Sequence, residues 1–236
     1  MTGERDQILG RIRGKLGKDN RAKSEQAVTD WLAKPGVKHE INPIPARGQI
    51  SGEALVDLFR EMLNVAAATI DDVDDLKDVP GAVSAWLAEQ NLPAEAVMSP
   101  DLRMDDIPWD DQSMLTLRRD RAQTSDAVGI TPVFSAVAET GTLMMASSAD
   151  TPTTLNFLPD NHIAIVRKSD IVGTYEEGWA KMRLRDPRVG DGNFMPRNVN
   201  LVTGPSRSAD IDKTLFMGAH GPRRLHIVIV DDVKED

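Results

Sequence analysis

Apolar positions recur along this chain with two different periods, which predicts helices interleaved with strands. A recurrence every three or four residues is typical of helices, whereas short continuous apolar runs are typical of buried strands. Helical patterns occupy residues 51–63, 81–90, 171–184 and 209–219. Strand-like runs occupy residues 96–98, 114–117, 127–130, 142–146, 162–166, 199–202 and 225–230, and residues 65–70 combine a helix end with a possible strand. This order of elements is typical of α/β proteins.

The last apolar run defines the expected sheet most clearly. Residues 225–230 are apolar throughout except for His226. A strand of this kind is expected where both faces of a parallel sheet are covered. The fold predicted for residues 46–236 is therefore a three-layer α/β/α open sheet, with His226 and His162 in structural roles.

Residues 1–45 have a different character and are predicted to form a helical arm with a linker. Ile8, Ile12 and Leu16 recur every fourth residue between basic side chains, and a second helical pattern surrounds Trp31. Prolines and glycines then dominate residues 34–50, as is typical of an extended connector.

Composition excludes several classes of function. The chain has 236 residues, a net charge of −9 and no cysteine. Its basic residues are dispersed, which argues against nucleic-acid binding. No apolar run approaches the roughly 20 residues of a membrane span, and the polar N-terminus does not resemble a signal peptide, so we expect a cytoplasmic protein. Without cysteine the chain holds no disulfide and no thiolate-ligated iron–sulfur cluster.

The turn at residues 203–211 is the first candidate site. An apolar run precedes it and a helical pattern follows, and ligands bind at such turns in open α/β sheets. In one interpretation the first helical N–H groups and Arg207 bind a carboxylate or phosphate. In the other, Ser206 simply caps the helix, because Asp210 and Asp212 already offset the helix dipole.

Two further polar turns contain candidate catalytic or ligand-binding residues. Glu139 precedes a glycine flanked by threonines, where its carboxylate can act as a general base or only accept backbone hydrogen bonds. His220 follows the helical pattern and precedes Gly221, so it either interacts with the helix end or faces a ligand as acid or base. A loop rich in proline and glycine at residues 185–197 is expected beside the site.

The candidate site joins these turns. Glu139 is the candidate catalytic residue, and the candidate ligand-binding residues are Thr140, Gly141, Thr142, Gly204, Pro205, Ser206, Arg207, Ser208, Asp210, His220 and Gly221. The four histidines have no paired spacing, so no metal site is expected. Dinucleotide, Walker-type and serine-nucleophile signatures are absent from the sequence.

Several segments together carry a family resemblance. Gly129-Ile130-Thr131 leading to residues 138–142, Leu158-Pro159 leading to residues 162–167, and the segments 203–211 and 218–222 resemble the lactate utilization protein C family, also called the LUD domain, over roughly residues 50–230. The resemblance implies a fold similar to sugar-phosphate isomerases and coenzyme A transferases. It also implies a place in a bacterial system that oxidises L-lactate to pyruvate and whose companion subunits carry iron–sulfur clusters.

Two main functional hypotheses follow, and whether the chain is itself catalytic stays open. In the first, the chain is a cytoplasmic subunit that binds a small anionic ligand or organises a complex with iron–sulfur partners. In the alternative, it is a self-sufficient enzyme that acts on a phosphorylated sugar or an acyl thioester. Because the resemblance extends to coenzyme A transferases, in which a glutamate beside a glycine turn is the nucleophile, Glu139 would then be the reacting carboxylate. A third hypothesis is a purely structural or regulatory module.

Overall fold

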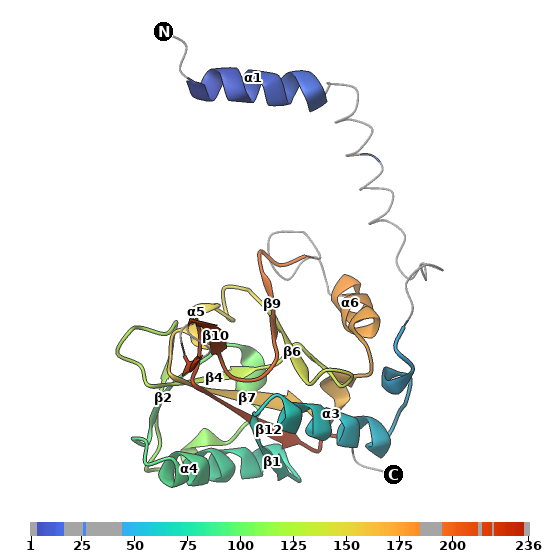
Figure 1. Cartoon of the computed structure of the whole chain (residues 1–236). Coiled ribbons are helices and arrows are strands. Elements are labelled where there is room, and N and C mark those ends of the chain that lie inside the picture. Colours follow the sequence, from blue (N-terminus) through green and yellow to red (C-terminus); the bar gives the residue numbers. More distant parts are fainter. Residues whose placement is uncertain are drawn as a thin grey trace. The chain divides into compact units, whose positions relative to one another are not determined.

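A six-stranded parallel sheet lies at the centre of residues 44–236 (Figure 1). The computed structural model describes residues 4–16, 26, 44–184, 195–211, 214–218 and 220–233. In spatial order the strands are β1 (Thr69–Val73), β12 (Arg224–Val230), β7 (Asn161–Arg167), β4 (Val128–Pro132), β2 (Glu95–Met98) and β3 (Thr116–Arg119). Every neighbouring pair is parallel, which confirms the predicted α/β class.

The chain divides into two compact units, residues 1–43 and 44–236. In the first unit, α1 (Glu4–Leu16) occupies the segment predicted to be helical, and Ile8 and Ile12 are exposed on it. The second helix predicted around Trp31 lies outside the described residues.

Two helices cover opposite faces of the parallel sheet. Helix α3 (Glu53–Val65) packs Phe59 and Leu63 onto a core that contains Val166 of β7. Helix α4 (Val79–Glu89) packs onto a second core that contains Ile165 of the same strand. Successive side chains of a strand point to opposite faces, so β7 and β12 are apolar throughout because each contributes to both cores. The predicted three-layer arrangement follows from this two-sided burial.

A second, smaller sheet shares the face covered by α3. Its strands are β8 (Ile171–Val172), β5 (Ser135–Val137), β6 (Thr142–Ala146) and β9 (Val199–Val202), in that order. Ala136 and Leu143 from this sheet lie in the same core as Phe59. On its other side, α6 (Tyr175–Arg183) packs so closely that a Cβ on Gly178 would lie 2.4 Å from the Met144 sulfur. The pattern at residues 171–184 predicted one helix, whereas its first two residues pair as β8.

Short helices complete the connections. They are η1 (Ala46–Gly48), η2 (Leu76–Asp78), η3 (Leu102–Met104), η4 (Trp109–Asp111), α5 (Thr154–Phe157) and η5 (Lys168–Asp170). Helix α5 contacts β4 and β7, and η3 and η4 place Met104 and Trp109 in the core beneath α4.

The helix predicted for residues 209–219 is wrong, because this segment forms the antiparallel hairpin of β10 (Arg207–Ile211) and β11 (Thr214–Met217). Its sequence contains β-branched and aromatic residues that suit strands. Long-range hydrogen bonds decide between the two structures: the Ser206 N–H donates to the Pro222 carbonyl at 2.8 Å, and the Gly218 N–H donates to the Ser206 carbonyl at 2.9 Å. Both contacts connect the ends of the hairpin, and a helix would not form them.

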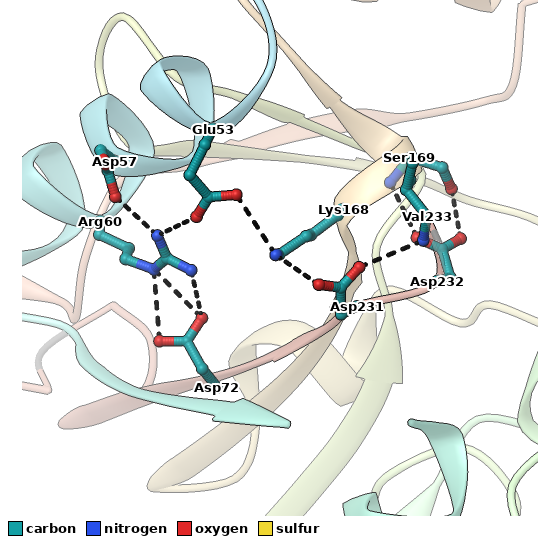
Figure 2. Close-up of polar contacts among 9 residues, drawn as sticks. All are labelled: Glu53, Asp57, Arg60, Asp72, Lys168, Ser169, Asp231, Asp232 and Val233. Atoms are coloured by element: carbon teal, nitrogen blue, oxygen red, sulfur yellow. Dashed lines mark hydrogen bonds and ion pairs between the residues drawn. The ribbon is translucent and has the colours of Figure 1, made fainter. Parts of the chain in front are cut away.

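Arg60 anchors α3 to the edge strand β1 (Figure 2). Its guanidinium donates to Asp57 at 2.7 Å and Glu53 at 3.0 Å, both on α3, and to Asp72 of β1 at 2.9 Å. The hydrogen bond from Arg60 lowers the pKa of the Glu53 carboxyl. These exposed pairs share one cation and fix the orientation of the helix more than they add to stability.

Lys168 continues this ionic network across the carboxyl ends of β7 and β12 (Figure 2). Its ammonium lies 2.6 Å from Asp231 and 3.4 Å from Glu53, and the bond to Asp231 raises the pKa of the lysine. Beside it, Ser169 donates its backbone N–H and its hydroxyl to Asp232. The chain segments that follow these two strands are therefore tied to each other and to α3.

Two histidines are buried in the parallel sheet. The His226 ring stacks on Trp86 of α4 with a centroid distance of 4.7 Å, and its Nδ1 lies 2.9 Å from the Thr69 hydroxyl. His162 is fully buried, with Nε2 2.7 Å from the Thr131 hydroxyl. Burial lowers the pKa of each ring from 6.5 to about 4, so both are neutral at physiological pH.

Replacement of Gly204 tests the close approach between α3 and the turn after β9. Gly204 has a φ of 74°, and an added Cβ would lie 2.2 Å from the Ala66 carbonyl oxygen. We expect Gly204→Ala to lower the free energy of unfolding by at least about 2 kcal/mol in urea titration. The control Gly81→Ala, where the nearest atom is 3.8 Å away in a helix, should be neutral or stabilising.

The buried histidines predict an acid-dependent loss of stability. Because the folded-state pKa lies below the unfolded-state value, the unfolded chain binds more protons between about pH 6.5 and 4, and stability falls as the pH falls through this window. The His226→Phe variant keeps a ring on Trp86 and should lose part of this dependence, on the order of 2 kcal/mol. Replacement of the exposed His220 with Phe should leave it unchanged. Equal slopes for all three proteins in denaturant titrations at several pH values would contradict the assignment.

Candidate functional site

The three turns predicted from the sequence lie together in the structure. The turn of residues 139–141 joins β5 to β6, and the turn of residues 203–206 joins β9 to β10. The hydroxyl oxygens of Thr142 and Thr203 are 2.6 Å apart and connect these two turns. The third turn, residues 220–222, joins the second through the His220 N–H, which donates to the Ser206 hydroxyl at 3.2 Å. Hydrogen bonds thus connect three sequence segments that are far apart in the chain.

Four hydroxyl groups form a cluster at the first turn. We call Thr140, Thr142, Tyr175 and Thr203 the hydroxyl cluster. The Thr142 hydroxyl lies 2.7 Å from that of Thr140 and 2.8 Å from that of Tyr175, and the Thr140 and Tyr175 oxygens are 3.0 Å apart. Thr142 is fully buried, so its neighbours are its only described hydrogen-bond partners.

Tyr175 was not among the residues predicted for the site. It is the only tyrosine of the chain and the first residue of α6. Its side chain reaches across to a hairpin more than thirty residues earlier in the sequence. Sequence periodicity placed this residue on a helix, but its contact with the threonines depends on how that helix crosses the small sheet.

Glu139 lies next to this cluster with one unsatisfied oxygen. Only 3% of the residue is exposed, and its Oε1 accepts the Tyr175 N–H at 3.3 Å, at the start of α6. A carboxylate is favourable at that position because the helix dipole is positive there. The Oε2 atom is buried and has no hydrogen-bond partner in the described part of the chain. A buried acceptor without a donor is costly, so this oxygen is the natural place for a ligand hydroxyl or a water molecule to donate.

Two glycines of the turns allow close contact with the end of α3. An added Cβ on Gly141, whose φ is 65°, would lie 2.7 Å from the Met62 carbonyl carbon, and Gly204 has a similar contact with Ala66. The group that approaches Gly141 is therefore protein backbone at the end of α3.

Arg207 also contacts the end of α3. One of its terminal nitrogens donates to the Ala66 carbonyl at 3.0 Å, and the side chain is exposed. The expectation that helical N–H groups bind an anion beside Arg207 is wrong, because β10 and not a helix begins here. The interpretation of Ser206 as a helix cap fails for the same reason. Its hydroxyl instead accepts from the third turn.

The remaining predicted residues have varied environments. Pro205 is buried, and Ser208 and Asp210 are part of β10, but their side chains are outside what the structure describes. His220 is exposed and follows a hairpin, so its expected interaction with a helix end is wrong. A Cβ added to Gly221 would lie 3.5 Å from a ring carbon of Phe157, so the glycine packs against this side chain. The loop expected at residues 185–197 is described only from residue 195.

The turns lie at the edge of the parallel sheet where strands β1 and β12 begin. Gly141 and Gly204 contact residues 62–66, which precede β1, and residues 218–222 precede β12. These are the amino ends of parallel strands, whereas the general rule for open sheets concerns the carboxyl ends. Polar residues at the carboxyl ends were not predicted as site residues. Arg167 is one of them, and its position directly after the apolar run of residues 162–166 was the available signal.

The described residues lack two features that would point to particular functions. They contain no group of three or more histidine, cysteine, aspartate or glutamate side chains arranged to hold a metal ion. No helix among them is both long and apolar enough to cross a membrane.

Strand order and layering define an α/β protein built on an open parallel sheet with a smaller sheet on one face. The family model of the LUD domain matches residues 23–230, and the chain therefore belongs to the LUD domain family. A solved structure of a DUF162 family protein from Deinococcus radiodurans is similar, with a TM-score of 0.53 and 25% identity over 77% of this chain and 99% of that one.

Several sequence relatives bear the name lactate utilization protein C. The one from Bacillus licheniformis is 38% identical over 44% of this chain and 42% of its own length, and the one from Exiguobacterium is 36% identical over 53% of each. In these two alignments the chain spans about half the length of the relative. The one from Anoxybacillus flavithermus is 27% identical over 95% of this chain and 98% of its own.

The hydroxyl cluster predicts a cost for removing its central member. Thr142→Val keeps the side-chain shape but leaves three hydroxyl neighbours without their shared partner. We expect the free energy of unfolding to fall by about 1–3 kcal/mol. Thr116→Val on the exposed edge strand β3 is the matched control and should change it by less than about 0.5 kcal/mol. Equal effects of the two substitutions would show that the cluster contributes nothing.

Proposed function

We propose that this chain is a cytoplasmic subunit of a bacterial L-lactate utilization system and supports oxidation of L-lactate to pyruvate. The observation that carries the proposal is the alignment with lactate utilization protein C of Anoxybacillus flavithermus, which extends over nearly the whole of both chains. Membership of the LUD domain family agrees with it.

In this proposal the electrons pass to iron–sulfur partner subunits. Iron–sulfur clusters are held mainly by cysteine thiolates, and this chain has no cysteine, so its own residues do not fit such a group. Oxidation of lactate removes the hydroxyl proton together with a proton and an electron pair from C2. In this proposal the chain binds the ligand and accepts its hydroxyl proton. The partner subunits accept the electrons.

Glu139 is the residue that we connect with the ligand. Its Oε2 is a buried acceptor without a donor, beside the hydroxyl cluster. A ligand hydroxyl that donated to this oxygen would satisfy it and could transfer its proton there. The hydroxyl cluster would supply further donors and acceptors to the same ligand.

A second candidate function uses the same atom in a different way. A carboxylate oxygen without hydrogen bonds keeps its lone pairs for nucleophilic attack, which favours a stand-alone enzyme acting on an acyl thioester. Attack of Oε2 on the thioester carbonyl would form an acyl anhydride with Glu139 and release the thiolate. A phosphorylated sugar is the other substrate class for this candidate.

Complementation tests the pathway and the residue together. The gene is deleted in the source bacterium and replaced by the wild type, by Glu139→Gln or by Glu176→Gln, with L-lactate as the carbon source. Glu176 is exposed in the same helical turn that Glu139 contacts, so it is a matched control. We expect wild type and Glu176→Gln to restore growth. Glu139→Gln should slow growth at least about tenfold at equal protein level, as expected for loss of a proton acceptor.

Other outcomes separate the hypotheses. Normal growth of the deletion strain on L-lactate, in the absence of another lactate-oxidising system, would contradict the pathway. Full growth with Glu139→Gln would remove this residue from the mechanism. Thioester cleavage by the purified chain alone, lost in Glu139→Gln, would support the second candidate.

A further inference from the structure

We propose that the iron–sulfur companion subunit docks over the three turns of the candidate site, on exposed apolar side chains that have basic residues beside them. The inference rests on the function proposed above, because it concerns the electron acceptor of the same site. It commits to a partner of one chemistry, a cluster-bearing protein with an acidic contact surface.

Four exposed apolar side chains lie next to the turns. We call Val65, Phe157, Leu158 and Leu201 the apolar rim, and they are 71%, 40%, 42% and 47% exposed. Single apolar side chains on a protein surface need no explanation, whereas a group of them beside polar residues is typical of an interaction surface. The position of each member relative to the turns therefore decides what the rim can contact.

Phe157 flanks the second and third turns. A Cβ added to Gly221 would lie 3.5 Å from a ring carbon of Phe157 and also 3.5 Å from the Cβ of Ser206. Leu158 follows directly in the chain and is exposed as well. The end of α5 thus places two large apolar side chains beside the turns.

The other two members lie beside the first and second turns. Leu201 of β9 is the register partner of Met144 in β6, and Met144 is two residues from Thr142. Register partners and alternate residues of a strand share a face, so Leu201 lies on the same face of the small sheet as the hydroxyl cluster. Val65 precedes Ala66, whose carbonyl contacts the second turn.

The charge beside the rim is positive. Residues 203–207 and 218–224 contain three arginines and no aspartate or glutamate, in a chain of net charge −9. Arg223 lies 3.6 Å from Asp160, but the two side chains are 60% and 61% exposed, so this pair contributes little. A basic surface selects a partner with an acidic contact surface. In a symmetric dimer through this face the arginines would oppose one another, so charge argues against a second copy of the chain.

A partner in this position suits the proposed reaction. An electron acceptor has to lie close to the ligand that it oxidises, and the ligand is proposed to bind at Glu139. Glu139 is only 3% exposed, whereas Thr203 of the hydroxyl cluster is exposed at the second turn. A subunit docked over the turns would therefore lie next to the site and would also exclude water from it.

The experiment measures binding of the full chain to the purified, cluster-loaded companion subunit of the same bacterium, by isothermal calorimetry under anaerobic conditions. Leu201→Asp places a charge in the apolar rim, and Arg223→Glu reverses a charge that faces the acidic partner. We expect each to weaken binding by at least about tenfold. Raising the salt concentration should weaken binding of the wild type, because the attraction is partly ionic.

The matched controls are Leu102→Asp and Arg121→Glu. Both residues are exposed and lie outside the turns, so these variants should bind as the wild type does. All four substitutions are at exposed positions, and urea titration checks that each variant is folded.

Two results would overturn the proposal. Either the wild type does not bind the companion subunit, or the two controls weaken binding as much as Leu201→Asp and Arg223→Glu do. Failure of the proposed function has a different signature, because it is measured as growth on L-lactate. Normal growth of the deletion strain together with rim-dependent binding would contradict the pathway and still support the docking surface. Glu139→Gln should bind the companion subunit but support little growth, whereas Leu201→Asp should lose both.

Discussion

Two-sided burial of β7 and β12 is the constraint on which the rest of the molecule depends. Side chains of β12 alternate between the core under α3 and the core under α4, so neither face of this strand tolerates water. One layer of helices would leave half of each strand exposed. The chain meets the requirement with α4 on one face and with α3 and the small sheet on the other. The ionic network around Arg60 and Lys168 then closes the carboxyl edge on the side of α3.

Elements whose apolar pattern reflects this burial were predictable from the sequence. The strands β7 and β12 and the helices α3 and α4 all lie within a few residues of their predicted positions. The short strands β5 and β8 were not predicted, because two or three residues are too few to establish a period. The hairpin of β10 and β11 was mistaken for a helix because contacts of Ser206 with Gly218 and Pro222 outweigh local preference, and no local pattern contains them.

The candidate site was only partly predictable, for a similar reason. Polar turns after apolar runs drew attention to Glu139 and Ser206, and the structure brings their turns together. The sequence could not show whether a residue in these turns contacts a ligand or a neighbouring segment of the chain. Gly204 and Arg207 both look like ligand contacts in the sequence, yet both contact the carboxyl end of α3. Tyr175 shows the converse, since an ordinary helical position becomes part of the hydroxyl cluster when α6 crosses the small sheet.

The place of β12 in the sheet has a consequence for the order in which the chain folds. Strand β1 is near the beginning of this domain, but its only described neighbour in the sheet is β12, which is formed by residues 224–230. During synthesis on a ribosome, β1 therefore has no partner in this sheet until residues 224–230 have been made. Strand β1 contains Asp71 and Asp72. Their like charges oppose pairing of the still unpaired strand with the same strand of a second nascent chain. Completion of the sheet is thus a late, long-range step, and the closing strand joins both sides at once.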